Sequence, residues 1–168
     1  MNADELRALQ APLKEQYRTT PEAARFTLRA EGKLGAGVTC RIDTAKAQVT
    51  AGLHPLAGGT GLEACSGDML LEALVACAGV TMNAVAMSLG IALRDATVQA
   101  EGEIDIRGTL GLSRETPVGF QTIRLNFLLD TDASEDQLAK LLVMTERYCV
   151  IYQTLAHPPE LSVTKRVA

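Results

Sequence analysis

Two of the four cysteines lie in apolar stretches with helical spacing, Cys77 within residues 66–89 and Cys149 within residues 134–155. Cysteine chemistry rests on the thiolate, which attacks electrophiles and disulfides. Taken alone, each cysteine is best interpreted as an inert core residue, because a free cysteine packs like a small hydrophobe. Two helices that each carry one cysteine on the apolar side change this interpretation, since both sulfurs then point toward one core. The pair is therefore the first candidate for thiol chemistry.

The other reactive side chains fit alternative chemistries poorly. Cys40 lies in a predicted strand and Cys65 lies beside a predicted helix start, so we interpret both as structural or incidental. His54 and His157 are far apart, and no Cys/His cluster has the spacing of metal ligands. The sequence also lacks a Cys-x-x-Cys pair, a Gly-rich nucleotide-binding motif and a Gly-x-Ser-x-Gly motif. We expect neither a metal nor a cofactor.

The composition is that of an ordinary globular protein. The chain has 168 residues, 47% hydrophobic and 21% charged, which allows one continuous core and does not predict disorder. A formal net charge of −4, no basic stripe and no Trp argue against nucleic-acid binding. The first residues lack the apolar segment of a signal peptide, and no run reaches the roughly 18 uninterrupted apolar residues of a membrane span. We expect a cytoplasmic protein without a membrane partner, in which four cysteines do not indicate a disulfide framework.

The N-terminal part is predicted to be a helical arm followed by a small antiparallel meander. Residues 2–17 are typical of a helix that Asn2 caps, and this arm packs either on a partner or on the body of the protein. We place the arm at residues 1–25 and a single domain at residues 26–168. Glycines and a polar turn separate three predicted strands, at residues 26–31, 38–43 and 47–53.

A loop rich in Gly and Pro, at residues 54–66, leads into the helix that carries Cys77. Ser66 is typical of an N-cap, Asp68 suits the positive end of the helix dipole, and Gly90 can end the helix in a left-handed conformation. The helix is apolar on all sides. That pattern predicts burial by a sheet or by a second subunit.

The second helix is predicted to be continuous over residues 134–155, with Cys149 in its interior. Ser134 and Gln137 have the spacing of a capping box at its start. Alternating or β-rich sequence predicts two strands before this second helix, at residues 96–107 and near 120–129. A last short strand is predicted after the helix, near residues 163–165.

The residues around both cysteines resemble the two cysteine motifs of the OsmC/Ohr family. Residues 58–61 (Gly-Gly-Thr-Gly) and 66–77 (Ser-Gly-Asp-Met-Leu-Leu-Glu-Ala-Leu-Val-Ala-Cys) resemble a Gly-Gly turn followed by Ser-Pro-x-Glu-Leu-Leu-Leu-x-Ala-Leu-x-x-Cys. Residues 145–149 (Thr-Glu-Arg-Tyr-Cys) resemble Ala-Glu-Lys-x-Cys-Pro-Val, with Val150 at the position of the Pro. The order of elements is also similar over about residues 26–163.

The resemblance implies an α+β fold in which antiparallel sheets pack around two long central helices, in an intertwined homodimer. It also implies a thiol peroxidase that reduces organic hydroperoxides, in which Cys77 becomes a sulfenic acid and Cys149 condenses with it into a disulfide. A dithiol reductant of the lipoyl type restores the pair. The alternative is a non-catalytic dimer of this fold that binds a hydrophobic or thiol/acyl ligand in its interfacial cleft. A purely structural stress-response dimer is the third possibility.

The resemblance further implies a Glu and an Arg near the reactive cysteine. The Glu corresponds most nearly to Asp68, whereas the Arg position falls by spacing near residues 35–37, which contain no Arg. Arg41 or Arg29 then supplies the cation, from the same chain or from the second subunit. Burial raises the pKa of a thiol unless such a group stabilises the thiolate. Asp68 and Arg41 are accordingly the predicted catalytic partners of Cys77 and Cys149.

Overall fold

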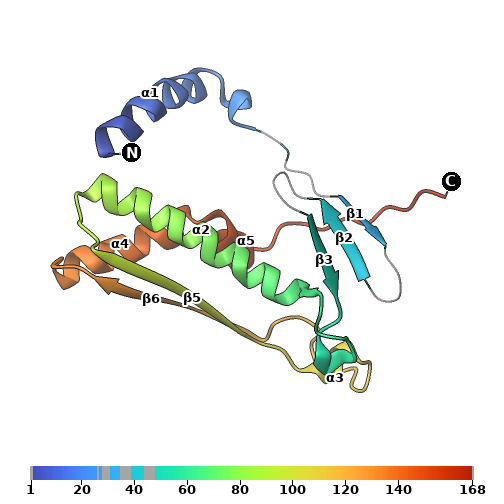
Figure 1. The fold of residues 1–168 in the computed structure, drawn as a ribbon. Coiled ribbons are helices and arrows are strands. Elements are labelled where there is room, and N and C mark those ends of the chain that lie inside the picture. Colours follow the sequence, from blue (N-terminus) through green and yellow to red (C-terminus); the bar gives the residue numbers. More distant parts are fainter. Residues whose placement is uncertain (1, 26, 28–30, 35–38, 44–47, 168) are drawn as a thin grey trace. The chain divides into compact units, whose positions relative to one another are not determined.

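The computed structural model describes residues 2–25, 27, 31–34, 39–43 and 48–167 (Figure 1). It divides the chain into two compact units. The first comprises Met1–Leu70 and Gly102–Ile123, and the second comprises Leu71–Glu101 and Arg124–Ala168. Both cysteine-bearing segments of interest, around Cys77 and Cys149, belong to the second unit. The α+β class is confirmed, and the predicted boundary near residue 25 stays a prediction.

Helix α1 (Ala3–Thr19) begins where the sequence predicts it. The Asn2 side chain accepts a hydrogen bond from the backbone N–H of Glu5, and the Glu5 carboxylate accepts one from the N–H of Asn2, both at 2.9 Å. This capping box satisfies two of the N–H groups that a helix start leaves without partners. None of the residues of α1 is buried, and a short 3-10 helix, η1 (Pro21–Ala24), follows it.

A four-stranded sheet of the first unit has the order β1-β2-β3-β4. The meander is confirmed by its antiparallel pairs, although the first strand begins at Glu31, where the predicted strand ended. The unpredicted β4 is only two residues long and runs parallel to β3, through the pairs Ala51–Ala64 and Gly52–Cys65. The strands are β1 (Glu31–Leu34), β2 (Thr39–Asp43), β3 (Gln48–Gly52) and β4 (Ala64–Cys65).

The loop between β3 and β4 contains the 3-10 helix η2 (Pro55–Ala57), which His54 caps by accepting the N–H of Leu56 at its Nδ1. Gly58 follows with φ 90°, a left-handed conformation that favours glycine. The predicted loop is therefore partly ordered by local caps, and it delivers the chain into the long helix that starts at Ser66.

Helix α2 (Ser66–Leu89) ends as predicted, before Gly90 at φ 69°, but Ser66 is its first helical residue and not its N-cap. By length and hydropathy alone α2 could cross a membrane, a test that core helices also pass, and only 28% of its most apolar window is buried. The predicted all-round burial is thus not reached within one chain. One stripe is buried, made of Leu74, Ala78, Met82, Val85 and Ala86.

The second half of α2 packs in the core of the second unit. Strands β5 (Asp95–Glu103) and β6 (Thr122–Asp130) form a two-stranded sheet, and Figure 1 shows α2 on the same side of it as the later helix α4. Arg94 joins the two strand ends by binding the carboxylates of Asp130 and Asp132. The buried core cluster consists of Met82, Val85, Ala86, Ile91 and Leu141.

Strand β5 is shorter than the predicted strand at residues 96–107. It ends at Glu103 because Asp105 caps a short helix, α3 (Ile106–Thr109), by accepting the backbone N–H of Arg107 at 3.0 Å. An Asp side chain that caps a helix competes with continuation of the strand. This corrects the C-terminal bound of the predicted strand.

The prediction of one continuous helix over residues 134–155 is wrong. The capping box of Ser134 and Gln137 starts helix α4 (Glu135–Tyr148) as predicted, but Cys149 has an extended conformation (φ −74°, ψ 108°) and separates α4 from α5 (Val150–Ala156). Aromatic and β-branched residues surround the break, and such residues favour helix less than straight-chain ones.

The strand predicted near residues 163–165 is also wrong. Residues 157–167 form neither helix nor strand, and the side chains of Leu161 and Val163 are 86% and 98% exposed. A strand needs a neighbouring strand to receive its backbone hydrogen bonds. Within the part of the chain that the structure describes, no strand pairs with this segment.

Candidate active site

The two candidate cysteines come from different elements of the second unit. Cys77 lies about three turns into α2 and is half-buried. Cys149 lies at the break between α4 and α5, and it is only 1% exposed. Both are free thiols. The predicted pair is therefore assembled from the middle of one helix and the end of another.

The two thiols affect each other's ionisation, because Cys149 lowers the pKa of Cys77 and Cys77 raises the pKa of Cys149. The expectation that the sulfurs approach each other thus agrees with the structure, while the catalytic roles of Cys77 and Cys149 remain predictions. Cys149 is held in place from both sides, because its N–H donates to the carbonyl of Thr145 and its carbonyl accepts the N–H of Gln153, each at 2.9 Å.

The first N–H groups of α5 act on the two cysteines. The backbone N–H of Tyr152 donates to Cys149 Sγ at 3.5 Å. The backbone N–H groups of Val150 and Ile151 lower the pKa of Cys77, and that of Ile151 also lowers the pKa of Cys149. A helix start leaves such N–H groups without helical partners. Here the sulfur of Cys149 satisfies one of them, the N–H of Tyr152.

These contacts give the two thiols different acidities. Burial by itself raises the pKa of Cys77, but hydrogen bonds from the backbone of Ile151, the thiol of Cys149, the backbone of Val150 and the hydroxyl of Thr81 together bring that pKa below its ordinary value. Each of these donors stabilises the thiolate over the thiol. Cys77 is therefore the member of the pair that ionises first.

The pKa of Cys149 shifts in the opposite direction, upward. Burial raises the pKa of Cys149, and the neighbouring Cys77 raises it further, while the backbone N–H groups of Tyr152 and Ile151 oppose the rise only in part. When one of the two thiols ionises, the proton therefore stays on Cys149. Because the thiolate is the nucleophile, this asymmetry favours Cys77 as the attacking sulfur.

The roles predicted for the charged residues Asp68 and Arg41 remain predictions. Asp68 lies exposed in the first turn of α2, in the first compact unit, and its predicted role remains a prediction. The backbone of Arg41 pairs with Lys33 and Thr50 in the sheet, but its side chain lies outside the described part of the structure, as does Arg29. The donors that reach Cys77 in the second unit are all neutral.

Thr81 is a site residue that the sequence analysis missed. It lies four residues after Cys77 on α2, on the same helix face, and its hydroxyl lowers the pKa of Cys77. The four-residue spacing alone predicts that the Thr81 hydroxyl lies near the Cys77 thiol. Nothing in the sequence predicts that Val150 and Ile151 affect the pKa of Cys77, because their effect comes from the backbone at a break in the helix.

We expect Thr81→Val to raise the pKa of Cys77 by about half a unit to one unit, the equivalent of one modest hydrogen bond. The measurement is the pH dependence of Cys77 alkylation, followed by mass spectrometry of the modified peptide. Thr81→Ser keeps the hydroxyl and serves as the control. An unchanged pKa in Thr81→Val, with Thr81→Ser also unchanged, would show that the hydroxyl does not act on the thiolate.

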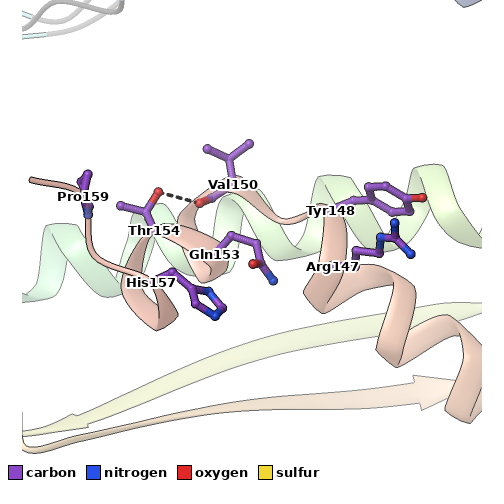
Figure 2. Close-up of a pocket in the computed structure, with 7 residues that line it drawn as sticks. All are labelled: Arg147, Tyr148, Val150, Gln153, Thr154, His157 and Pro159. Carbon is purple, nitrogen blue, oxygen red and sulfur yellow. Dashed lines mark hydrogen bonds between the residues drawn. The ribbon is translucent and has the colours of Figure 1, made fainter.

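A shallow pocket of about 410 Å³ lies on the outer side of α4 and α5. The guanidinium of Arg147 lies 5.6 Å from the ring centre of Tyr148, and Figure 2 shows Gln153 and His157 extending from the side of α5 opposite to Val150. Neither cysteine lines this pocket. We therefore assign it no role in thiol chemistry.

Comparisons with known proteins place this geometry in a wider context. A family described as OsmC-like protein matches residues 59–164, a segment that contains both Cys77 and Cys149 and exceeds half of the chain. No curated protein matches the sequence. Several solved structures share the fold.

An OsmC-like protein from Mycoplasma pneumoniae is 19% identical, with a TM-score of 0.67 over 79% of this chain and 89% of that chain. An organic hydroperoxide resistance protein from Elizabethkingia anophelis, with thiocyanate bound, is 16% identical, with a TM-score of 0.64 over 80% and 91%. An organic hydroperoxide resistance protein OsmC from Legionella pneumophila is 16% identical, with a TM-score of 0.62 over 79% and 90%. At these identities the similarity shows the fold.

Proposed function

Because this chain belongs to the OsmC-like protein family, we propose that it reduces organic hydroperoxides with Cys77 and Cys149 as its redox pair. The observation that carries the proposal is the interacting pair of free thiols, in which the pKa of Cys77 is lowered and the pKa of Cys149 is raised. The names of two structurally similar proteins, which are organic hydroperoxide resistance proteins, support the same substrate class.

In the first step the Cys77 thiolate attacks the hydroperoxide. A sulfur–oxygen bond forms, the oxygen–oxygen bond breaks, and the alkoxide leaves as the alcohol after it takes a proton from the Cys149 thiol. Cys77 is oxidised by two electrons to a sulfenic acid, and the hydroperoxide is reduced to an alcohol. The proton transfer leaves Cys149 as a thiolate, ready for the next step.

In the second step the Cys149 thiolate attacks the sulfur of the sulfenic acid. A disulfide forms, and the hydroxyl leaves as water after taking one proton from solvent. A dithiol, for which we propose the lipoyl type, then attacks the disulfide, becomes a disulfide itself and restores both protein thiols. We propose the cytoplasm as the compartment, because its reducing poise keeps the resting pair as thiols.

We further propose that the chain acts as an intertwined homodimer. The exposed remainder of α2 supports this, since Val80 on that helix is 73% exposed although the helix is apolar on all sides. A second copy would remove that apolar surface from water, which is the main driving force of association. Predicted site residues such as Asp68 and Arg41 could then come from either copy.

The proposal is tested by titrating the fully reduced protein with cumene hydroperoxide or a fatty-acid hydroperoxide. Without reductant we expect about one equivalent to be consumed per site, together with a Cys77–Cys149 disulfide found by mass spectrometry. With dihydrolipoamide we expect continuous turnover. A protein that consumes no hydroperoxide would contradict the proposal, and retention of a hydrophobic or acyl ligand in native mass spectrometry would then support the non-catalytic alternative.

A further inference from the structure

The pocket on the outer side of α4 and α5 has the size and the lining of a site for a small ligand. Its volume of about 410 Å³ falls within the range of about 300 to 1,000 Å³ that is usual for such sites. Tyr148 and Pro159 give the pocket apolar surface, while Arg147, Gln153 and His157 give it polar groups. The proposed peroxidase chemistry uses none of these side chains.

The pocket carries positive charge, although the chain as a whole is negative. Arg147 supplies a full positive charge, and the lining contains no Asp or Glu in the part of the chain that the structure describes. The formal net charge of the chain is −4. A cleft lined by charge of one sign attracts ligands of the opposite sign. The pocket therefore favours an anion.

Arg147 is positioned by an aromatic ring and not by a carboxylate. Its guanidinium lies 5.6 Å from the centre of the Tyr148 ring, which is a cation–π contact. Among the described residues, no hydrogen bond or ion pair occupies this guanidinium. Its planar set of N–H donors matches the two oxygens of a carboxylate. Arg147 is therefore oriented and available for a ligand.

Gln153 joins the two helices that form the pocket. Its side-chain amide donates to the carbonyl of Glu146 at 2.9 Å, one residue before Arg147. The backbone N–H of His157 donates to the carbonyl of Gln153 at 2.9 Å, and Figure 2 shows the Gln153 amide between the side chains of Arg147 and His157. These hydrogen bonds form the pocket before a ligand arrives, which lowers the conformational cost of binding.

We propose that this pocket binds a small organic carboxylate, with its two oxygens on the Arg147 guanidinium and its apolar part against Tyr148 and Pro159. His157 supplies a further hydrogen-bonding group at the other end of the pocket. A carboxylate fits better than a phosphate dianion, because the lining holds only one full positive charge. This inference goes beyond the proposed function, since neither cysteine lines the pocket.

The test is a titration of the full-length protein with octanoate, followed by nuclear magnetic resonance of the backbone amides. We expect octanoate to shift the amides of residues 147–159, and the neutral analogue octan-1-ol to bind more weakly. Arg147→Gln should weaken octanoate binding about tenfold, because it removes a charge-assisted pair of hydrogen bonds. Arg147→Lys keeps the charge and should lose less. Since Arg147 is exposed, these variants should fold.

Arg18→Gln is the matched control, because it removes one exposed positive charge from α1 in the first compact unit. It should leave octanoate binding unchanged. Equal affinities in Arg147→Gln and Arg18→Gln would overturn the proposal, as would octan-1-ol binding as tightly as octanoate or an absence of shifts at residues 147–159.

An oligoglutamate peptide that binds through Arg147 while octanoate does not bind would also overturn the proposal, and it would assign the pocket to an acidic polypeptide. None of these measurements requires hydroperoxide turnover or a change in the oxidation state of the cysteines. A protein without peroxidase activity can therefore still confirm or contradict the carboxylate site.

Discussion

Cys77→Ser is expected to abolish hydroperoxide reduction. A serine hydroxyl does not ionise near neutral pH and cannot form a sulfenic acid, so kcat/KM should fall by more than about a thousandfold, as is typical when a nucleophile is removed. The fold should persist, since serine is close to cysteine in size and Cys77 is only half-buried. The measurement is hydroperoxide consumption with dihydrolipoamide as the electron donor.

Cys65→Ser is the matched control for this variant. Cys65 is also half-buried, but it lies in β4 of the first compact unit and is not part of the thiol pair. Its loss should leave turnover near the wild-type value. If Cys65→Ser were inactive while Cys77→Ser remained active, the assignment of the nucleophile would be wrong.

The rate of the first oxidation step should follow the ionisation of Cys77. Its pKa lies below the ordinary value of a thiol, with hydrogen bonds outweighing the effect of burial. The rate should therefore be nearly constant above that pKa and should fall as the pH is lowered through it, because the thiolate is then protonated. Stopped-flow measurement of sulfenic acid formation against pH tests this, and a rate that keeps rising up to the ordinary thiol pKa would contradict it.

Cys149→Ser is expected to retain the first oxidation step and to lose most of the catalytic cycle. The sulfenic acid on Cys77 should accumulate, because no second thiol remains to condense with it, and trapping with dimedone followed by mass spectrometry detects it. Serine also caps helices well, so α5 should persist and the loss can be assigned to chemistry. Steady turnover at the wild-type rate with the dithiol would show that Cys149 does not resolve the intermediate.

Cys149→Ala separates the chemical role of this residue from its structural role. Alanine provides neither a resolving thiol nor an acceptor for the N–H of Tyr152. We expect the same accumulation of sulfenic acid as in Cys149→Ser, together with faster amide exchange in α5, since loss of a cap costs about 1 kcal/mol. Equal exchange rates in the two variants would show that the sulfur does not stabilise α5.

The predictions that rest on local chemistry agree best with the structure. The Asn2 cap, the capping box at Ser134 and the glycine after α2 require only residues near each other in sequence, and all three occur as predicted. The extent of α2 follows from its uninterrupted helical sequence. Such features are encoded within one turn of the chain and can be found without knowledge of the tertiary structure.

The features that were missed depend on contacts between distant segments. Residues 138–155 keep helical spacing without Gly or Pro, so nothing local marks the break at Cys149, where the N–H of Tyr152 bonds to the sulfur of Cys149 instead. The wrong strand near residue 163 has suitable alternation but lacks a neighbouring strand in the described chain. Asp68 and Arg41 came from the family resemblance, and their roles stay predictions.

Cys77 and Cys149 interact although they are distant along the chain. A disulfide between Cys77 and Cys149 would close a loop of about 70 residues, which in the chain-entropy model stabilises the folded state by about 4 kcal/mol. The loop encloses the β5–β6 ribbon and all of α4, and so most of the core of the second unit. Oxidation would then restrict the unfolded chain, and the resting dithiol protein would be the form with the lower melting temperature.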